Sequence, residues 1–540
     1  GCKMCNLNIE MKKPSFDYIV IGGGSAGSTI SGRLSENSNN SILLLEEGPR
    51  DKSIYIHIPV TYYKTAQGPL LKRYNYVRSA EQTPQHKATM VQAKVLGGGS
   101  SVNAMLYLRG NANDYADWEK AGAKGWGYED VIKYFKKSED NNTFHNKVHG
   151  VNGPLGVSDC SYKHNLSRVW LKACQEYGLP FNADFNSGEQ QGCGFYQVTI
   201  RNGRRSSASK AYLSNKRDNL TVQTGCKVLR IIFEGKRAVG VEFIKNGKKE
   251  TVYSKKEIIV SAGAFGSPHL LLLSGLGPKE DLKEHGIPVV KDLPNVGQNY
   301  QDHIEMSLIY KLKGAFSYDK YKKLQWQAVA GLQFLLFNAG PATSNIIETG
   351  AFWWSSQGKT LPDLQLFFLA GAGIEEGKDG VPGGNGCTIS ITQTRPESVG
   401  YIKLQSSDPY KQPLIVPNYI TSPNDLKTLA DGAKLVQDIM SQEAFKDYVE
   451  ASHVPEKPLK TQEDFENFVR KEAYPGLHPC GTCRIGEDET TSVVDPELKV
   501  HGVEGLRVAD ASVMPNVISG NLNAVTIMIG EKAADLILNG

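Results

Sequence analysis

The segment FDYIVIGGGSAGSTISGRLSENSNNSILLLEEG, residues 16–48, constrains the fold of this chain more than any other part of the sequence. Residues 18–21 form an apolar run that predicts a short buried strand of a parallel sheet. A Gly-x-Gly-x-x-Gly turn follows at residues 22–27, then a helix-compatible stretch, then a second apolar run at residues 42–45, directly before Glu46. This order of strand, glycine turn, helix, strand and acid is typical of a dinucleotide-binding unit.

Each part of this unit has a physical reason. Glycines let the main chain approach a pyrophosphate, and the helix that begins there offers free N–H groups and a positive dipole end to the anion. Glu46 lies 19 residues after Gly27 and can accept hydrogen bonds from an adenosine ribose, with Glu47 as the alternative. The unit alone does not separate NAD from FAD. The residues expected to contact the cofactor here are Gly22, Gly24, Ser25, Gly27 and Glu46.

Two further glycine-rich segments follow. AKVLGGGSSVNAMLYLRGN, residues 93–111, has three glycines and two serines between apolar runs, which is unlike a flexible linker. VSAGAFGSPHLLLLSGLGP, residues 260–278, has a glycine-rich turn before four leucines that predict core packing. In both segments we expect main-chain atoms to approach an extended ligand.

Together the three segments resemble the glucose–methanol–choline (GMC) oxidoreductase family, in which FAD is the cofactor. The resemblance covers essentially the whole chain, and within the family it is greatest to choline dehydrogenases and medium-chain aliphatic alcohol dehydrogenases. Supporting stretches are DFNSGEQQGCGFYQV (184–198), NVGQNYQDHIEM (295–306), PLIVPNYI (413–420) and GLRVADASVMP (505–515).

The resemblance implies further contacts to FAD, at Gly98, Ser100, Ser101, Asn103, Ala104, Val228, Asp510 and Asn523. Some members of the family attach FAD covalently to a histidine in the second glycine-rich segment. The aligned position in this chain is Val102, and valine has no nucleophile. We therefore expect noncovalent FAD.

The resemblance also implies a catalytic pair beside flavin N5, formed by His478 in LHPCGTCRIG (477–486) and by Asn521 before the C-terminal helical pattern. Oxidising an alcohol removes a hydride, which the flavin accepts, and a proton. A neutral imidazole, with a reference pKa of about 6.5, can take that proton. An amide is not a base, so Asn521 is expected to orient the substrate oxygen. Many relatives carry a second histidine at the position of Asn521, which makes His478 the principal base candidate.

Cys480 and Cys483 have CxxC spacing and three interpretations. A zinc site would need two more ligands, for which Cys2 and Cys5 are the candidates. A thioredoxin-like redox pair would need its own fold context. We favour small-residue packing around a tight loop and predict no metal site.

The substrate side is represented by SNIIETGAF, residues 344–352, which places Glu348 among apolar neighbours. In choline-oxidising relatives a glutamate at the matching position faces the trimethylammonium group, and a buried carboxylate needs such a partner. Tyr76 is implied as a cation–π contact. Relatives that act on uncharged alcohols keep this glutamate, so a structural carboxylate paired with an arginine or lysine stays open as the alternative.

The positions of these motifs predict an α/β (α+β) chain with a Rossmann-like FAD-binding domain and a second, substrate-binding domain built on an antiparallel sheet with helices. The FAD-binding domain is discontinuous, with residues 1–159, 215–303 and 477–540. The substrate-binding domain takes residues 160–214 and 304–476. Alternating runs such as CTISITQT and YIKLQS indicate the strands of its sheet.

Composition excludes several classes of function. The 540 residues contain 61 Lys and Arg against 57 Asp and Glu, a net charge of +4, which argues against nucleic-acid binding. No apolar run reaches the roughly 18–20 residues of a membrane span. The expected partners are a small alcohol and an electron acceptor, either quinone or oxygen. The expected location is cytoplasmic or at the periphery of a membrane, and membrane association is left open.

Two alternatives remain. The first keeps the fold and changes the chemistry, because the family includes a hydroxynitrile lyase and a fatty acid photodecarboxylase. The latter shares the LPDLQ stretch at 361–365, but Thr394 stands where its active-site cysteine aligns, and it lacks a histidine equivalent to His478. The second alternative is a flavin-binding protein without catalysis, against which the presence of His478 argues.

Overall fold

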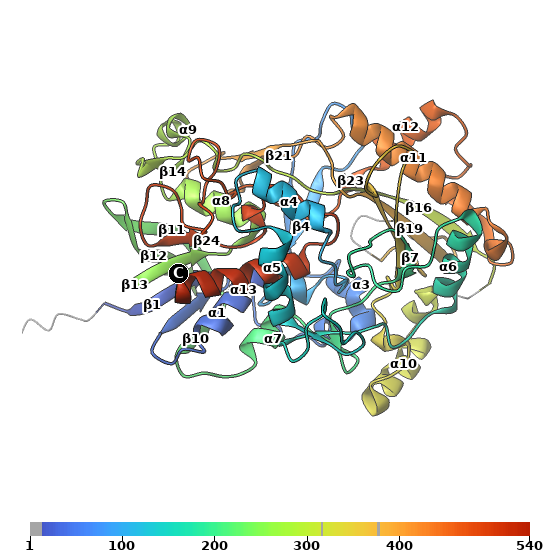
Figure 1. The fold of residues 1–540 in the computed structure, drawn as a ribbon, viewed down its shortest axis with the longest axis horizontal. Coiled ribbons are helices and arrows are strands. Elements are labelled where there is room, and N and C mark those ends of the chain that lie inside the picture. The colour runs from blue at the N-terminus through green and yellow to red at the C-terminus, as the bar shows by residue number, and fades with distance from the viewer. Residues whose placement is uncertain (1–12, 315–316, 375–378) are drawn as a thin grey trace, which may run out of the picture.

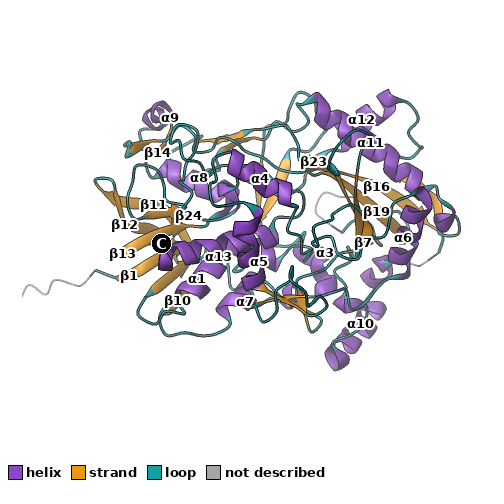
Figure 2. Cartoon of the chain, viewed as in Figure 1, coloured by secondary structure: helices purple, strands orange, loops and turns teal. Residues whose placement is uncertain are grey.

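A computed structural model describes residues 13–314, 317–374 and 379–540 of the chain. Two large sheets lie towards opposite ends of the long axis of the molecule, with helices around each of them (Figures 1 and 2). Each sheet has seven strands. The mixed α/β class that the sequence predicts is confirmed.

The first sheet contains the dinucleotide-binding unit. Its strand order is β10-β2-β1-β13-β12-β11, and β24 pairs with β13. The neighbouring strands β10, β2, β1, β13 and β24 pair in parallel. Strand β12 pairs antiparallel with both β13 and β11. The strand bounds are β1 Ser15–Ile21, β2 Ile42–Leu45, β10 Leu220–Gln223, β11 Cys226–Glu234, β12 Arg237–Lys245, β13 Lys248–Val260 and β24 Leu506–Val508.

Helices cover this sheet and bury its parallel strands. All four residues of β2 are buried, as the apolar run in the sequence predicts. Helix α1 (Ser25–Leu34) packs against α13 (Asn523–Asn539) in front of the sheet, so the last helix of the chain lies beside the first (Figure 1). The first glycine turn and the C-terminal segment therefore meet.

The second sheet has the order β22-β16-β19-β18-β17-β7, with β23 beside β16, and every pair in it is antiparallel. Helices α6 (Asn165–Tyr177) and α11 (Pro423–Met440) pack on it, and β18 and β19 are buried along their whole length. The strand bounds are β7 Gly192–Phe195, β16 Ile304–Leu312, β17 Thr349–Trp353, β18 Leu364–Leu369, β19 Gly386–Gln393, β22 Val449–Val454 and β23 Tyr474–Pro475. The predicted antiparallel sheet is thus present.

The strands of the two sheets follow the predicted division of the chain, but one helix does not. Helix α7 (Ala208–Leu213) lies in a segment predicted for the substrate-binding domain, yet it packs against α1. The two helices can approach closely because Gly32 has no side chain: a Cβ there would lie 2.5 Å from the carbonyl oxygen of Tyr212. The domain limits themselves stay a prediction.

Shorter elements connect and cover the sheets. They include α2 Ile54–His57, α3 Tyr62–Thr65, α4 Ala112–Lys120, α5 Tyr128–Ser138, α8 Gly263–Leu273, α9 Lys279–Glu284, α10 Leu324–Phe337, α12 Gln462–Glu472, η2 Gly98–Ser101, η3 Tyr318–Lys322 and η4 Pro341–Thr343. Throughout the described part of the chain, no helix is both long enough and apolar enough to cross a bilayer.

Candidate active site

The first glycine turn leads from β1 into α1 and leaves the start of that helix open. Gly22 has a φ of 96°, and a Cβ on Gly27 would lie 1.8 Å from the carbonyl oxygen of Gly22, so both positions require glycine. Gly24 caps α1 without a side-chain hydrogen bond, and a Cβ there would meet nothing closer than 3.9 Å. The first turn of α1 therefore has N–H groups without a side-chain cap, and Gly24, Ser25 and Ala26 line a cavity, which suits an anion.

A cavity lies at this turn and gathers residues from distant parts of the chain. Seven of the residues predicted to contact the cofactor line it: Gly22, Gly24, Ser25, Glu46, Gly98, Val228 and Asp510. Its wall also includes Lys72, Lys227 and His269, which the sequence analysis did not single out. The cavity therefore joins the three glycine-rich segments, as their predicted common role requires.

Glu46 and Glu47 both line the cavity, but they differ in their partners. The buried carboxylate of Glu46 accepts main-chain hydrogen bonds from Gly23 (3.0 Å) and Gly48 (2.6 Å), and burial raises its pKa to about 7. Glu47 instead pairs with lysines, including Lys227 at 3.5 Å. Glu46, at the end of β2, keeps the position expected of the ribose contact, and that contact stays a prediction.

In the second glycine-rich segment, the serine side chains form hydrogen bonds with main-chain atoms of the protein. Ser100 Oγ donates to the Gly97 carbonyl (2.5 Å) and accepts from the Ala208 N–H (2.9 Å), and Ser101 Oγ donates to the Leu96 carbonyl (2.7 Å). Their hydroxyl groups thus shape the turn. Neither serine lines the cavity, and the contact to FAD that we predicted for them stays a prediction.

Arg205 holds the end of this segment in place. Its Nη1 donates to the carbonyl oxygens of Ser100 (3.1 Å) and Asn103 (2.8 Å) and to Asn103 Oδ1 (3.0 Å). The carbonyl of Ala104, another predicted contact, accepts from Asn345 Nδ2 (2.9 Å). Val102 is buried among apolar side chains. The amide oxygen of Asn103 and the carbonyl of Ala104 are therefore already engaged within the protein.

Unpartnered polar atoms test whether the site fits FAD. Asn523 Oδ1 accepts from Ser25 Oγ (2.9 Å) at the start of α1, while the buried Nδ2 of Asn523 has no partner in the described structure. The buried Nε2 of His269, in the cavity wall, is also unpartnered. Asp510 accepts from the Gly263 N–H (2.9 Å) and thereby fixes the start of α8. A dinucleotide in the cavity would supply a partner for the imidazole of His269, which lines the wall, whereas Asn523 reaches the cavity only through Ser25.

The two predicted catalytic side chains are in direct contact. Asn521 Nδ2 lies 3.2 Å from His478 Nε2, although 43 residues separate them in the chain. On the other side of the imidazole, His478 Nδ1 lies 2.9 Å from His303 Nδ1. Asn521 Oδ1 in turn accepts from Gln365 Nε2 (3.2 Å) on β18. Four side chains from four separate segments thus form one hydrogen-bonded row.

This row fixes the tautomer of His478. His303 Nε2 lies 2.8 Å from the carbonyl oxygen of Ile518, which can only accept, so His303 carries its proton on Nε2. Its Nδ1 is then an acceptor, and His478 must donate to it from Nδ1. Nε2 of His478 is consequently unprotonated and accepts from the amide of Asn521. The imidazole presents a lone pair on the side of Asn521.

Burial keeps both imidazoles neutral. The pKa of His478 is well below its usual value, because of burial first and the neighbouring His303 second. Burial lowers the pKa of His303 to about 4. Beside them, burial raises the pKa of Asp302 to about 7. A neutral His478 whose Nε2 is unprotonated and accepts from the Asn521 amide is in the protonation state that a general base requires.

Local structure explains how His478 reaches this position. It follows β23, whose Pro475 pairs with Ile304 at the start of β16, immediately after His303. Leu477 has a φ of 63°, a left-handed conformation that a leucine adopts only when its surroundings enforce it. The main-chain N–H of His478 donates to Asp302 Oδ1 (2.8 Å). The loop is therefore tied to the start of the second sheet.

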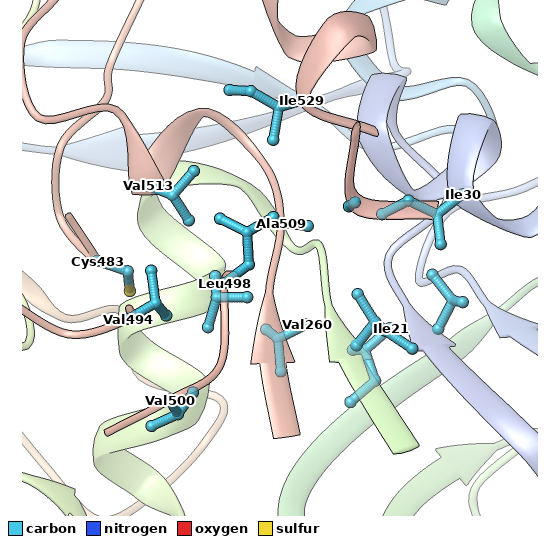
Figure 3. Close-up of a cluster of buried hydrophobic side chains, with 14 of the residues drawn as sticks. Ile21, Ile30, Val260, Cys483, Val494, Leu498, Val500, Ala509, Val513 and Ile529 are labelled. Atoms are coloured by element: carbon cyan, nitrogen blue, oxygen red, sulfur yellow. The ribbon is translucent and has the colours of Figure 1, made fainter. Parts of the chain in front are cut away.

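The cysteines of the same loop belong to the core. Cys480 and Cys483 are fully buried free thiols, and Figure 3 shows Cys483 packed beside Val494 and Val513. Among the residues that the structure describes, no cluster could hold a metal ion. Cys2 and Cys5 lie outside the described residues. The contacts of Cys480 and Cys483 agree with the packing interpretation.

Glu348 is held by hydrogen bonds from four neutral groups of the protein. Its carboxylate is completely buried and accepts from the His164 N–H (2.7 Å), Ser167 Oγ (2.8 Å) and the hydroxyls of Tyr318 and Ser344. Within the described ranges no arginine or lysine forms an ion pair with it, so the alternative of a basic partner is wrong. Four neutral donors stabilise the carboxylate instead, while burial still raises its pKa. A contact to a substrate cation stays a prediction.

Tyr76 lies in a different group of side chains. Its ring packs edge-on against Tyr419 at 5.4 Å, and its hydroxyl accepts from Gln82 Nε2 (3.3 Å). Tyr419 in turn donates to Asp302 Oδ2 (2.7 Å). Tyr76 is thus connected through Tyr419 to Asp302, which binds the main chain of His478. It shares no described contact with Glu348. Its cation–π role stays a prediction.

The sequence analysis missed His303, Asp302 and Gln365 as members of the site. All three lie in stretches quoted only for their resemblance, NVGQNYQDHIEM and LPDLQ. The signal that could have found them is the presence of polar side chains within or next to apolar runs: Asp302 and His303 directly precede the run that forms β16, and Gln365 lies within β18. Such side chains need buried partners.

Comparison with known proteins identifies the family of the chain. The two sequence profiles of the GMC oxidoreductase family match residues 16–305 and 396–530. Mitochondrial choline dehydrogenase of Homo sapiens is 39% identical over 97% of this chain and 90% of its own length. Oxygen-dependent choline dehydrogenase of Sinorhizobium fredii is 40% identical over 97% of this chain and 95% of its own length.

Solved structures show the same fold. Formate oxidase of Aspergillus oryzae, in a study of FAD modification, superposes with a TM-score of 0.91 at 27% identity, over 98% of both chains. An FAD-dependent oxidoreductase of Chaetomium thermophilum gives 0.87 at 26% identity, over 97% of this chain and 99% of the other. The chain therefore belongs to the GMC oxidoreductase family, as an FAD-dependent oxidoreductase that acts on CH–OH groups.

Proposed function

We propose that this chain oxidises a primary alcohol to the aldehyde, with His478 as the base. Bound FAD supplies the acceptor of the hydride, at N5. The observation that carries the proposal is the unprotonated Nε2 of His478, held beside the amide of Asn521. A general base must offer such a lone pair to the hydroxyl proton.

In this proposal His478, Asn521 and His303 have different roles. His478 Nε2 takes the proton of the hydroxyl group while the adjacent carbon loses its hydride and the C=O double bond forms. Asn521 Nδ2, which donates to Nε2 in the described structure, can donate to the substrate oxygen instead. His303 holds Nδ1 of His478, so that the proton is accepted only at Nε2. A positioned base of this kind typically accelerates a reaction about 10²–10⁴-fold.

Two substrate classes are in view, and choline is the first. The choline dehydrogenases at 39% and 40% identity favour it. Glu348 would supply the negative charge that a quaternary ammonium group needs, and its four hydrogen bonds from neutral donors support the ionised form. Uncharged primary aliphatic alcohols are the second class, for which Glu348 would be structural only.

Anaerobic mixing tests the reaction itself. The FAD-loaded protein is mixed with choline, hexanol and other primary alcohols while the flavin absorbance is followed. We expect at least one alcohol to bleach the flavin. If none does, alcohol oxidation is wrong, and two parallel assays cover the other chemistries: alkane formation from palmitate under blue light, and cleavage of a cyanohydrin.

Glu348→Gln separates the two substrate classes. A substrate cation that contacts the carboxylate predicts a large rise in KM for choline and little change for hexanol. If Glu348 is structural only, KM should change equally for choline and hexanol. The NH2 group of the glutamine would face two hydrogen-bond donors where an oxygen now accepts from both, which costs about 1–3 kcal/mol of stability. Melting temperature and flavin content, measured on the same samples, show how much of the effect is loss of structure.

The electron acceptor is tested with the same preparation. We propose quinone or oxygen, and one relative is named as oxygen-dependent. Reoxidation of the alcohol-reduced flavin is timed with dissolved oxygen and with an artificial quinone in parallel. The faster acceptor identifies the protein as an oxidase or a dehydrogenase, and reoxidation by neither would contradict both choices.

A further inference from the structure

Helix α10 (Leu324–Phe337) is apolar around its circumference and yet mostly exposed. Only Ala330 and Phe334 are buried. The exposed large side chains are Leu324 (82%), Trp326 (40%), Val329 (59%), Leu332 (59%), Leu335 (69%), Leu336 (64%) and Phe337 (72%). A helix that is apolar on all sides is ordinarily buried on all sides. A contiguous apolar patch on one surface element indicates an interaction site.

The helix stands at the edge of the molecule. Figure 1 shows it projecting from the body below the second sheet. Its inner side packs on Ile58 and Val60, and the nearby α2 adds the exposed side chains of Ile54 (57%) and Tyr55 (41%). Exposed apolar side chains thus occur on α10 and on α2, whose C-terminal neighbour Ile58 packs against the buried side of α10.

Positive charge lies directly before the helix. Lys320, Lys322 and Lys323 precede α10, which itself contains neither Asp nor Glu. Lys322 pairs with Asp319 (3.1 Å), and Lys320 lies over the ring of Trp326 at 5.0 Å. Lysines beside exposed Trp, Leu and Phe side chains are the composition of a segment that lies in the interface of an anionic bilayer. A second copy of this chain would offer no negative charge from its own α10.

The length of the helix excludes a span. Its 14 residues extend about 21 Å at 1.5 Å per residue, against roughly 30 Å for the hydrocarbon core. An apolar stretch of this length is typical of a core helix or of an interfacial segment, and the exposure of α10 excludes the core. We propose that α10, with the lysines before it, docks this protein onto an anionic lipid surface.

Docking would place the substrate side next to the lipid. Tyr318, in η3 before α10, and Ser344, after η4, both donate to the carboxylate of Glu348. The segments immediately before and after α10 are thus both connected to the buried carboxylate of Glu348. The docking inference does not depend on the proposed alcohol oxidation, because it rests on the surface alone.

Vesicle flotation tests the docking. The FAD-loaded full chain is mixed with vesicles of phosphatidylcholine alone, or of phosphatidylcholine with phosphatidylglycerol. We expect wild type to float with the anionic vesicles, and Leu335→Glu with Leu336→Glu to lose at least about tenfold in partitioning. The matched control places the same charges elsewhere, with Val151→Glu and Val399→Glu, which are 48% and 45% exposed. Lys320→Gln with Lys323→Gln should weaken the preference for phosphatidylglycerol.

The outcomes distinguish docking from its rivals. Flavin absorbance and melting temperature verify that each variant is folded, and the uncharged pair Leu335→Ser with Phe337→Ser repeats the test with a milder change. Wild type that stays unbound, or a helix variant that floats like wild type, overturns the proposal. So does a wild-type dimer that becomes a monomer in the helix variant, because a second copy would then cover α10.

Discussion

The cavity at the first glycine turn is lined in part by one continuous segment, from the end of β1 to Glu46, and the glycines of that segment leave main-chain atoms uncovered. The histidine site is assembled instead from side chains of His303, Gln365, His478 and Asn521. The cavity depends on where side chains are missing, whereas the histidine site depends on which atom of each side chain carries a proton. Substitutions should therefore fail differently in the two regions: by loss of the cofactor in the first, and by loss of rate in the second.

The largest effect is expected at Gly27. A Cβ there would lie 1.8 Å from the Gly22 carbonyl oxygen, which requires the turn to move. Gly27→Ala should yield protein without bound flavin, as measured by absorbance after purification and after reconstitution. Gly380→Ala is the matched control, because nothing lies within 4 Å of a Cβ at that position. Normal flavin content in Gly27→Ala would contradict the comparison, because flavin binding would then not require the absence of a side chain at this turn.

His478→Ala is expected to show the opposite pattern. It should retain FAD and slow flavin reduction by at least about a hundredfold, because the proposed base is removed. Stopped-flow absorbance under anaerobic conditions measures the rate. His285→Ala, whose imidazole bonds only to the Asp281 carbonyl among the described contacts, serves as the control. An unchanged rate would remove His478 from its proposed role.

His303→Ala should cost less, about tenfold, because the base remains but is no longer oriented. The pH profile provides the sharper readout. The pKa of His478 is lowered by burial and by His303, so the wild-type rate should stay level as the pH falls through 6.5. Without His303, the acid limb should move up towards 6.5. If rate falls but the acid limb stays in place, His303 has only a structural role.

The smallest effect concerns stability. The pKa of His303 is about 4 in the folded protein, against about 6.5 when unfolded. Between these values the unfolded state binds more protons, so this contribution is complete above pH 6.5 and is lost as the pH falls towards 4. The melting temperatures of wild type and His303→Ala should therefore converge over that window. A difference that is constant with pH would show that the neutral imidazole is not what stabilises the row.

The cavity could be largely predicted from the sequence, because its determinants are local. A strand, a glycine turn and a helix that follow one another leave little freedom in where Gly22, Gly24 and Glu46 lie. The orientation of Ser100 and Ser101 could not be predicted. Their hydroxyls have a choice between a ligand and nearby carbonyls, and the fold of the turn makes that choice.

By itself, the sequence indicated the nucleotide unit and the antiparallel second sheet, and its resemblance to the family singled out His478 as the candidate base. Only the tertiary structure decided which groups the buried polar side chains contact. His303 bonds to His478, four neutral donors surround Glu348, and the ring of Tyr76 packs edge-on against Tyr419. Hydrogen bonds of buried side chains join residues that lie far apart in the chain. They are set by the packing of the two sheets, which no local pattern of residues records.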